Sequence, residues 1–356
     1  MQSSGLRDLR LFRDGQMVAD GYREGKLDDG DYVFRNVMLK SDAKKVTFTA
    51  YAFSTELIKS PTASLDYEIK TTSMTPPRRR AFLLQVGVNH YAAQECDLKY
   101  SVKDAEKMSA DLSERLRAQG FDVEAIKLES VAESDVQGAA KETIHARLAE
   151  IAATANPDDV LFVSFSGHGY SAANGTFYVL PSNIEGSCKD AANLKNMISA
   201  DELANWLRPI DAGEMTLILD ACESAASVQS GGFKPGPLGS KGLGQLAYDK
   251  RMRILAASQS DEVAHEYDYL QHGLLTYVLT HDGLEKKQAD WKPRNGTITL
   301  AEWLSYAEFA VPKFLPYAAM TSTHRSAVDR FRSDNNKTIQ IPALFDFSKT
   351  DSLRLQ

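Results

Sequence analysis

The sequence predicts an α/β fold, with one mostly parallel sheet flanked by helices and a small immunoglobulin-like β-sandwich in front of it. Apolar strands alternate with amphipathic helices from residue 81 to residue 325, which is typical of parallel βαβ units. Residues 1–70 contain only short alternating segments and turn signals, which are typical of antiparallel strands. We therefore expect a sandwich at 1–70, a linker at 71–80, a main domain at 81–325 and a tail at 326–356 that packs on the main domain.

The first part shows alternation of apolar and polar residues with a period of two, and an Asp14-Gly15 turn signal. Strands are expected at residues 9–13, 17–18, 31–39, 45–53 and 63–69. A sheet system this small has exposed edges, so we expect further residues upstream or an interaction partner. No residue in this part suggests chemistry, which favours an accessory packing or interaction module. The linker that follows contains the stiff Pro76-Pro77 pair and three arginines, Arg78 to Arg80.

The main domain contains clear signals for the starts and ends of helices. Ser199 with Glu202, and Thr299 with Glu302, form the pattern of a capping box, and Gly120 ends an earlier helix. Strands are expected at residues 81–88, 123–128, 160–165, 175–181, 215–219 and 252–257, and helices near residues 102–116, 144–151, 200–207, 275–279 and 300–304. A glycine-rich loop is expected at residues 231–244.

Composition excludes several classes of function. The chain has 356 residues and a formal net charge of −7, so nothing favours nucleic-acid binding. It has no apolar run long enough to span a membrane and no basic-then-apolar start, so we expect a cytoplasmic protein. Its three cysteines, Cys96, Cys188 and Cys222, are too few and too scattered for a disulfide framework or a zinc site.

Two strand ends carry the residues most suited to catalysis. Residues 160–165 form a continuous apolar run that ends in Ser166-Gly167-His168-Gly169, and a second run ends in Asp220-Ala221-Cys222. A lone cysteine is usually a small core residue, and a lone histidine is more often structural. Because both residues follow apolar strands, and ligands bind at the carboxyl ends of parallel strands, we interpret His168 and Cys222 as a catalytic pair.

The same segment supplies a candidate oxyanion hole. The backbone N–H groups of Gly169 and Cys222 could donate to the oxygen of a tetrahedral intermediate. His265 and His272 follow a later strand and could line the cleft, although a structural role is the commoner one for such residues.

These motifs resemble those of the caspase-like cysteine peptidases, and are closer to metacaspases and bacterial caspase-like proteins than to animal caspases. Further similarity lies at residues 83–91, 98–105, 177–181, 253–259 and 272–276. The resemblance covers about residues 81–283 and implies a caspase–hemoglobinase fold. It also implies that Cys222 attacks the peptide carbonyl and that His168 protonates the leaving amine and then activates water.

The resemblance further implies specificity for a basic residue before the cut bond. Asp104, Ser166 and Asp220 match the metacaspase positions that hold an arginine or lysine side chain. Physically, Ser166 and Asp220 each lie two residues before a member of the pair, which places them on the same face of an extended strand. Two carboxylates in one pocket attract a cation and repel acidic side chains. The expected partner is therefore a protein or peptide substrate with a basic residue at that position.

The sequence departs from the family in two places. Glu223 stands where metacaspases usually have histidine, and an acid facing Cys222 would disfavour the thiolate. Asn183 and Glu185 lie where many metacaspases bind calcium, but no clear cluster of acids is evident, so we expect no cofactor and no metal, with calcium as the alternative.

The predicted function is a cysteine endopeptidase that cuts after arginine or lysine. Self-cleavage is expected at one of the basic residues in exposed segments, which are Arg78, Arg79, Arg80, Lys234 and Lys241. The alternative is a catalytically silent caspase-like domain that acts in protein assembly.

Overall fold

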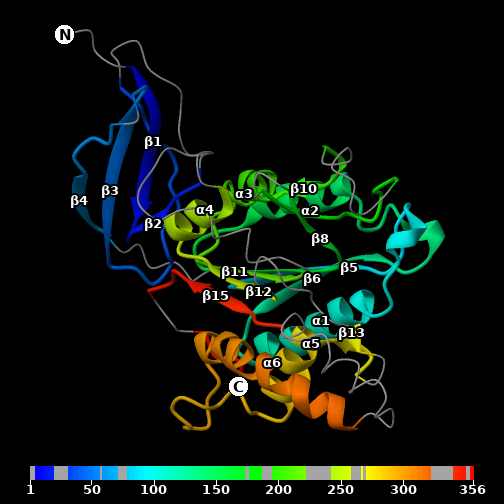
Figure 1. Cartoon of the computed structure of the whole chain (residues 1–356). Helices are drawn as coiled ribbons and strands as arrows, with labels where there is room; N and C mark the ends of the chain where they lie inside the picture. Colours follow the sequence, from blue (N-terminus) through cyan, green and yellow to red (C-terminus); the bar gives the residue numbers. More distant parts are fainter. Residues whose placement is uncertain are drawn as a thin grey trace.

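The structure of the chain is a computed structural model, in which a central sheet lies between two layers of helices (Figure 1). It describes residues 5–19, 31–56, 58–70, 78–172, 176–186, 195–221, 242–257, 266–267, 270–321, 340–349 and 353–356. The α/β class predicted from the sequence is confirmed.

The central sheet has six strands in the order β15-β12-β11-β7-β5-β6. Five of them are mutually parallel, and only the edge strand β15 runs antiparallel to its neighbour. Their bounds are β5 (Arg80–Val88), β6 (Asp122–Ser130), β7 (Val160–Ser166), β11 (Glu214–Asp220), β12 (Arg253–Ala256) and β15 (Ala343–Asp346). Every residue of β7 is buried, as its continuous apolar sequence predicts for a strand covered on both faces.

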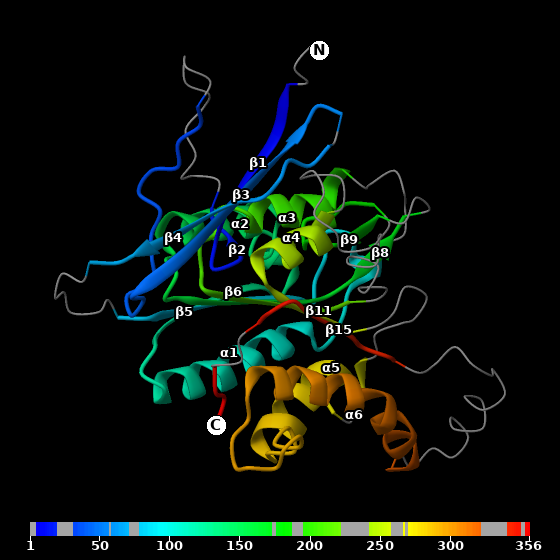
Figure 2. The same cartoon turned by 90° about the vertical axis from the view of Figure 1, so that its left-hand side faces the viewer.

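Helices cover both faces of the sheet, as the two perpendicular views show (Figures 1 and 2). One layer contains α2 (Lys141–Thr154), α3 (Ala200–Leu207) and α4 (Gly242–Lys250). The other contains α1 (Ser101–Ala118), α5 (Leu274–Tyr277) with the π-helix at Val278–Glu285, and α6 (Leu300–Thr321). Within the described residues, no helix combines the length and apolar character needed to cross a bilayer.

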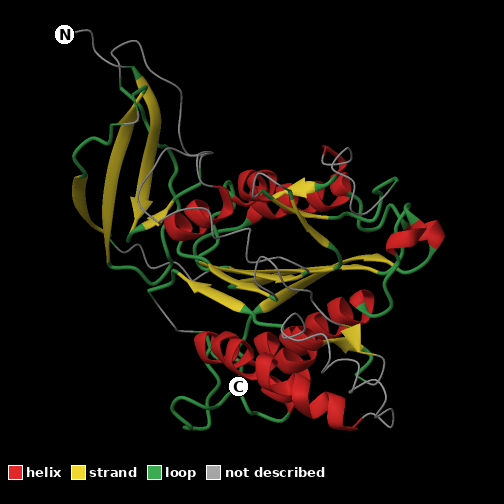
Figure 3. Cartoon of the chain, in the orientation of Figure 1, coloured by secondary structure: helices red, strands yellow, loops and turns green. Residues whose placement is uncertain are grey.

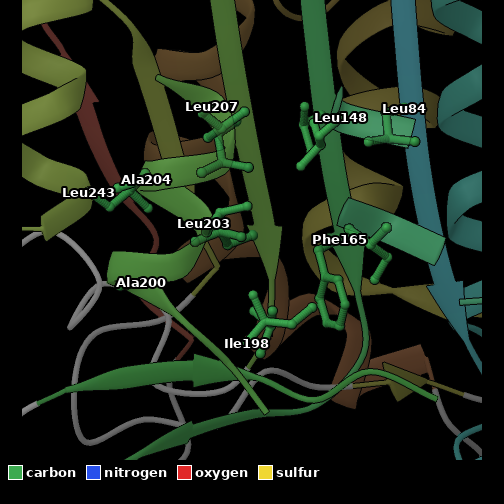
Figure 4. Packing of buried hydrophobic residues seen from close by; sticks show 14 of the residues in the cluster. Leu84, Leu148, Phe165, Ile198, Ala200, Leu203, Ala204, Leu207 and Leu243 are labelled. Atoms are coloured by element: carbon green, nitrogen blue, oxygen red, sulfur yellow. The ribbon is translucent and has the colours of Figure 1, made fainter. Parts of the chain in front are cut away.

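The first helical layer packs on the sheet through branched aliphatic side chains. Leu203 and Leu207 of α3 and Leu148 of α2 lie over Leu84 and Phe165 of the sheet (Figure 4). Burying one such side chain contributes roughly 1.5–3 kcal/mol, so this layer fixes β7 firmly under α2 and α3.

Both predicted capping boxes are confirmed. The Ser199 hydroxyl accepts from the Glu202 N–H, while the Glu202 carboxylate accepts from the Ser199 N–H. Thr299 and Glu302 make the same reciprocal pair at the start of α6. Gly120 adopts φ +83°, the left-handed conformation expected just after a helix end.

The N-terminal part differs from the predicted sandwich. Among the described residues up to 70, the structure has one four-stranded sheet in the order β2-β1-β3-β4, which stands beside α4 (Figure 1). Its strands are β1 (Leu6–Arg13), β2 (Gln16–Met17), β3 (Lys45–Ser54) and β4 (Ala63–Glu68). The expected strand at residues 31–39 is wrong, because this stretch forms no strand beyond a single bridge residue, Phe34.

Buried ion pairs join this sheet to the main domain. Arg10 lies between Asp8 of its own strand, at 2.8 Å, and Asp249 of α4, at 2.9 Å. Arg13 pairs with Asp211 at 3.0 Å, and Gln16 donates to the Ala212 carbonyl. The sheet therefore shares polar contacts with the domain, and its residues Phe12, Tyr51 and Phe53 also belong to the domain's hydrophobic core.

The two ends of the predicted main domain also differ in detail. Residues 71–77 of the expected linker lie outside the described residues, and Arg80, placed in that linker, is instead the first residue of β5. Its guanidinium pairs with Asp159 at 2.7 Å. In the tail, residues 343–346 form β15 and so extend the central sheet (Figure 3, strands in yellow).

Candidate active site at the strand ends

The two strands that carry the catalytic candidates are parallel neighbours, as predicted. Ser166, the last residue of β7, stands directly opposite Asp220, the last residue of β11. Beyond them, the Gly167 N–H donates to the Asp220 carbonyl at 3.3 Å. The chain therefore leaves both strands at the same point of the sheet edge, which is where ligands bind in open α/β sheets.

His168 is held by contacts on both its backbone and its ring. Its N–H donates to the Tyr91 hydroxyl at 2.9 Å, and the two rings lie 5.4 Å apart. Its Nε2 lies 2.8 Å from the Cys96 carbonyl oxygen, which can only accept, so Nε2 carries a proton. In the neutral ring the lone pair then resides on Nδ1, which is the nitrogen able to act as a base.

The loop that supplies the Cys96 carbonyl is itself fixed by hydrogen bonds. It connects β5 to α1 and includes the short 3-10 helix Gln94–Cys96. Asp97 accepts from the Tyr91 N–H at 2.9 Å, and the Asn89 side chain accepts from the Val102 N–H at 3.0 Å. These bonds position the tyrosine and the carbonyl that together orient His168.

Gly169 begins a small sheet of β8 (Gly169–Ser171), β9 (Phe177–Val179) and β10 (Ile198–Ser199). The Leu180 N–H donates to the His168 carbonyl, which makes His168–Leu180 a hydrogen-bonded pair of this antiparallel ladder. Because such pairs alternate, Gly169–Val179 is a non-hydrogen-bonded pair and the Gly169 N–H points away from β9. This direction is compatible with the predicted role of Gly169 as an oxyanion donor.

Cys222 lies outside the described residues, two positions beyond the end of β11. Its pairing with His168 and the donor role of its N–H therefore stay predictions. Cys188, His265, Lys234 and Lys241 also lie outside the described residues.

The three predicted pocket residues lie close together. The Ser166 hydroxyl donates to Asp104 Oδ2 at 3.1 Å, which joins the end of β7 to the first turn of α1. The Gly273 N–H lies 3.2 Å from Asp104 Oδ1 and 3.1 Å from Oδ2. His272 Nδ1 lies 2.8 Å from Asp104 Oδ1. Three donors thus surround a carboxylate that is only 2% exposed.

The second carboxylate approaches the same glycine. Asp220 Oδ2 accepts from the Thr276 hydroxyl at 3.0 Å. A Cβ built on Gly273 would lie 2.9 Å from Asp104 Oδ2 and 3.0 Å from Asp220 Oδ2. Asp104 and Asp220 therefore converge on Gly273, and any larger residue there would collide with both carboxylates.

Burial dominates the ionisation of Asp104. Loss of solvent raises the pKa of this carboxyl above its usual value, while His272, the Gly273 N–H and Ser166 act in the opposite direction.

No group of three or more candidate metal ligands occurs among the described residues. Asn183, which was considered for calcium, instead bonds Glu142 through its amide nitrogen at 3.2 Å and accepts from the Lys141 N–H.

Sequence reasoning missed several residues of this site. Tyr91 and Cys96 act through a hydroxyl and a backbone carbonyl, and no local pattern distinguishes them. Gly273 and Thr276 lie in a segment noted only for its resemblance, and their contacts depend on the packing of α5 against β11 and α1. His272 was named as a cleft residue but was not connected to Asp104.

The comparisons with known proteins agree with this arrangement. A family model described as "Metacaspase, peptidase C14 domain" matches residues 79–230, a range that includes all six predicted site residues. The match supports a caspase-like fold for this part of the chain. This family assignment supports cysteine peptidase chemistry for the domain.

Solved structures similar to this chain include two with low sequence identity. One is a protein from Geobacter sulfurreducens, with TM-score 0.45 and 14% identity, covering 77% of this chain and 95% of that chain. Another is caspase-1 from Spodoptera frugiperda, with TM-score 0.44 and 14% identity, covering 78% of this chain and 92% of that chain. No curated protein matches the sequence significantly.

Proposed function

We propose that the chain is a cysteine endopeptidase that hydrolyses peptide bonds after arginine or lysine. The observation that carries the proposal is the pair of buried carboxylates, Asp104 and Asp220, which converge on Gly273 beside the strand end that leads to His168. A guanidinium or ammonium group between them would form charge-assisted hydrogen bonds, whereas an acidic side chain would be repelled.

The proposed chemistry uses His168 and Cys222. Nδ1 of His168 takes the thiol proton, and the Cys222 sulfur adds to the peptide carbonyl to give a tetrahedral oxyanion. The Gly169 and Cys222 N–H groups donate to that oxygen. As the C–N bond breaks, His168 passes its proton to the leaving amine and a thioester remains. Water then adds to the thioester with His168 as base, and the acid product leaves as the thiol re-forms.

The direct test is a fluorogenic peptide screen with arginine, lysine, aspartate or asparagine before the reporter, run with and without calcium. We expect cleavage after arginine and lysine, and its loss in Cys222→Ala and His168→Ala. Activity on aspartate alone would overturn the pocket assignment. Absence of activity under every condition would favour the silent domain.

We also propose self-cleavage near the start of the domain. Arg78 and Arg79 are both exposed, and the Arg78 guanidinium lies 3.9 Å from Asp122, whereas Arg80 is paired within β5. Intact mass after incubation of the wild type beside Cys222→Ala tests this, with a cut after Arg78 or Arg79 expected only in the wild type. Identical single masses for the two proteins would contradict self-cleavage. A cut found only after Lys234 or Lys241 would show that Arg78 is not the site.

A further inference from the structure

The N-terminal sheet ends in an edge strand, β4, whose outer side has no partner strand in the described part of the chain. Among these residues β4 pairs only with β3, and all six of its residues are exposed. The strand lies on the side of the sheet that faces away from the helices of the main domain (Figure 1, blue strands). A row of unpaired N–H and C=O groups at such an edge is a template for a further strand.

The hydrogen-bond pattern determines which backbone groups of β4 are available. The Ile69 N–H donates to the Lys44 carbonyl at 2.9 Å, and this hydrogen-bonded pair continues the register of β3 with β4. Hydrogen-bonded pairs alternate along an antiparallel ladder, so the odd-numbered residues of β4 bond to β3. The N–H and C=O groups of Ser64, Asp66 and Glu68 therefore point to the free edge.

One face of β4 carries exposed apolar side chains. Leu65 is 62% exposed and Tyr67 is 50% exposed, although both lie opposite apolar residues of β3, which are Phe48 and Val46. Cross-strand contacts with a further strand would cover these two side chains on their open side. The strand that fits this edge therefore has apolar side chains at alternate positions, and β4 itself has this pattern.

We propose that β4 pairs with β4 of a second copy of this chain, antiparallel and with Leu65 at the two-fold axis. In this register Ser64 lies opposite Asp66 of the second copy, and the two residues exchange both N–H···O bonds because their backbone groups point to the free edge. Tyr67 lies opposite the small Ala63 of the second copy, which leaves room for its ring. The same contacts occur twice, as in any isologous interface, and the two sheets become one.

The charges along the edge favour this register. Glu68 lies opposite Thr62 of the second copy, and the Thr62 hydroxyl accepts from the Lys59 ammonium of its own chain at 2.9 Å. A carboxylate therefore meets an ammonium at each end of the interface. Within each copy, Lys45 lies 2.8 Å from Asp66 and compensates the charge of that carboxylate. The neighbouring register, shifted by two residues, would instead place the two Asp66 carboxylates opposite each other.

The oligomeric state of the full 356-residue chain tests the interface. Sedimentation velocity of a Cys222→Ala parent, which cannot cleave itself by the proposed chemistry, should show a monomer–dimer equilibrium that depends on protein concentration. Glu68→Lys and Lys59→Glu should each raise the dissociation constant by at least about tenfold, because two like-charge contacts replace two attractive ones. The variant that combines both substitutions should dimerise like the parent. Glu114→Lys, at an exposed position of α1, is the control and should have no effect.

Disulfide formation tests the register. With Cys188→Ala added, the parent keeps only Cys96, which is buried. Leu65→Cys should form an intermolecular disulfide, because the two positions face each other in a non-hydrogen-bonded pair with Cα atoms about 4.5 Å apart. Tyr67→Cys alone should form none, since its two copies are offset by four residues, about 13 Å along the strand. A mixture of Tyr67→Cys with Ala63→Cys should again form the disulfide.

The outcomes decide the proposal without any measurement of peptidase activity, so it can fail while the proposed function stands. A parent that stays monomeric at every concentration overturns it and leaves the edge to a different partner. A dimer that neither charge substitution weakens forms through another surface and also overturns it. Disulfide formation by Tyr67→Cys as readily as by Leu65→Cys rejects the register. Circular dichroism of each variant confirms folding, which these exposed positions should preserve.

Discussion

Gly273 is a residue whose side chain must be absent for Asp104 and Asp220 to keep their positions. Its φ of −63° suits any amino acid, so the requirement for glycine comes from close approach and not from backbone conformation. A methyl group there would contact both Asp104 and Asp220 at about 3 Å. The close packing of the two carboxylates against this backbone therefore depends on glycine at position 273.

Gly273→Ala should reduce kcat/KM for arginine and lysine substrates by at least about tenfold, which corresponds to about 1.4 kcal/mol. The loss should appear mainly in KM, because the methyl group enters the substrate's space and does not touch His168. The control is Gly5→Ala, where the added Cβ makes only an ordinary 3.4 Å contact with Thr55. Full activity of Gly273→Ala would show that the substrate does not bind between these carboxylates.

Tyr91 supports the catalytic histidine through its hydroxyl. Tyr91→Phe removes the hydroxyl that accepts from the part-buried His168 N–H, and a typical hydrogen bond of this kind contributes about 0.5–1.5 kcal/mol. We expect lower stability and a lower kcat with little change in KM, since the pocket residues keep their contacts. Urea unfolding and steady-state kinetics measure both, with Tyr277→Phe as control. A change confined to KM would contradict this positioning role.

At the residue scale, the sequence was informative where a residue type follows a strand. Ser166, His168 and Asp220 could be placed because buried parallel strands end where ligands bind. Tyr91, Cys96 and the pairing of His272 with Asp104 could not be predicted. These contacts join segments far apart in the chain, and only the packed structure determines which atoms meet.

At the element scale, strong periodic patterns predicted helices and strands correctly, whereas weak patterns did not. The strands of the parallel sheet and both capping boxes were evident from local sequence. The first three residues of α4, Gly242 to Gly244, were interpreted as the end of a glycine-rich loop because glycine disfavours helix, and the rest of this helix was not predicted. It forms because Leu243, Leu246 and Ala247 are buried, so tertiary packing overrides a low propensity.

Helix α4 also carries a titratable contact with the N-terminal sheet. Burial raises the pKa of Asp249 to about 6, although Arg10 and Gln245 oppose this rise. Because the folded-state pKa exceeds the unfolded value, the folded protein binds more protons between about pH 4 and about pH 6. The contribution of this carboxyl to stability is thus fully present below the unfolded pKa and is lost as pH rises through about 6.

Asp249→Asn should remove this dependence. The free energy of unfolding of the wild type, relative to that of the variant, should fall as pH rises from about 4 to about 6 and then stay level. Urea unfolding of both proteins at each pH gives the difference between their free energies of unfolding. The contributions of carboxyls that the two proteins share cancel in this difference. A difference that increases with pH would mean that the Arg10 ion pair outweighs burial and that the pKa of Asp249 is lowered.

At the scale of the whole molecule, the N-terminal sheet is attached differently from what its sequence indicates. The turn signals between short segments predicted a separate sandwich. The alternation of apolar and polar residues in β1 would ordinarily direct Leu9 and Leu11 into its core. The structure instead buries Asp8 and Arg10 more deeply than these leucines, since Asp249 of α4 supplies a partner for the guanidinium. A preference of this kind cannot be predicted from one strand alone, because the partner lies 239 positions away.

Because the sheet shares a core and buried ion pairs with the domain, the whole chain should unfold in a single transition. The three tryptophans, Trp206, Trp291 and Trp303, all lie outside the N-terminal sheet, so their fluorescence reports on the domain. Hydrogen exchange of peptides from β1 and β3 reports on the sheet. Both probes should give the same urea midpoint, as expected when one cooperative unit unfolds.

Arg10→Ala tests how strongly the two parts are joined. It leaves Asp8 and Asp249 without their shared cation, and breaking a buried pair in this way costs about 3–5 kcal/mol. Both probes should therefore shift to lower urea together. Lys45→Ala is the control, because its pair with Asp66 is exposed to solvent and such pairs contribute little to stability. If β1 and β3 exchange at lower urea while tryptophan fluorescence keeps its wild-type midpoint, the sheet is an independent module after all.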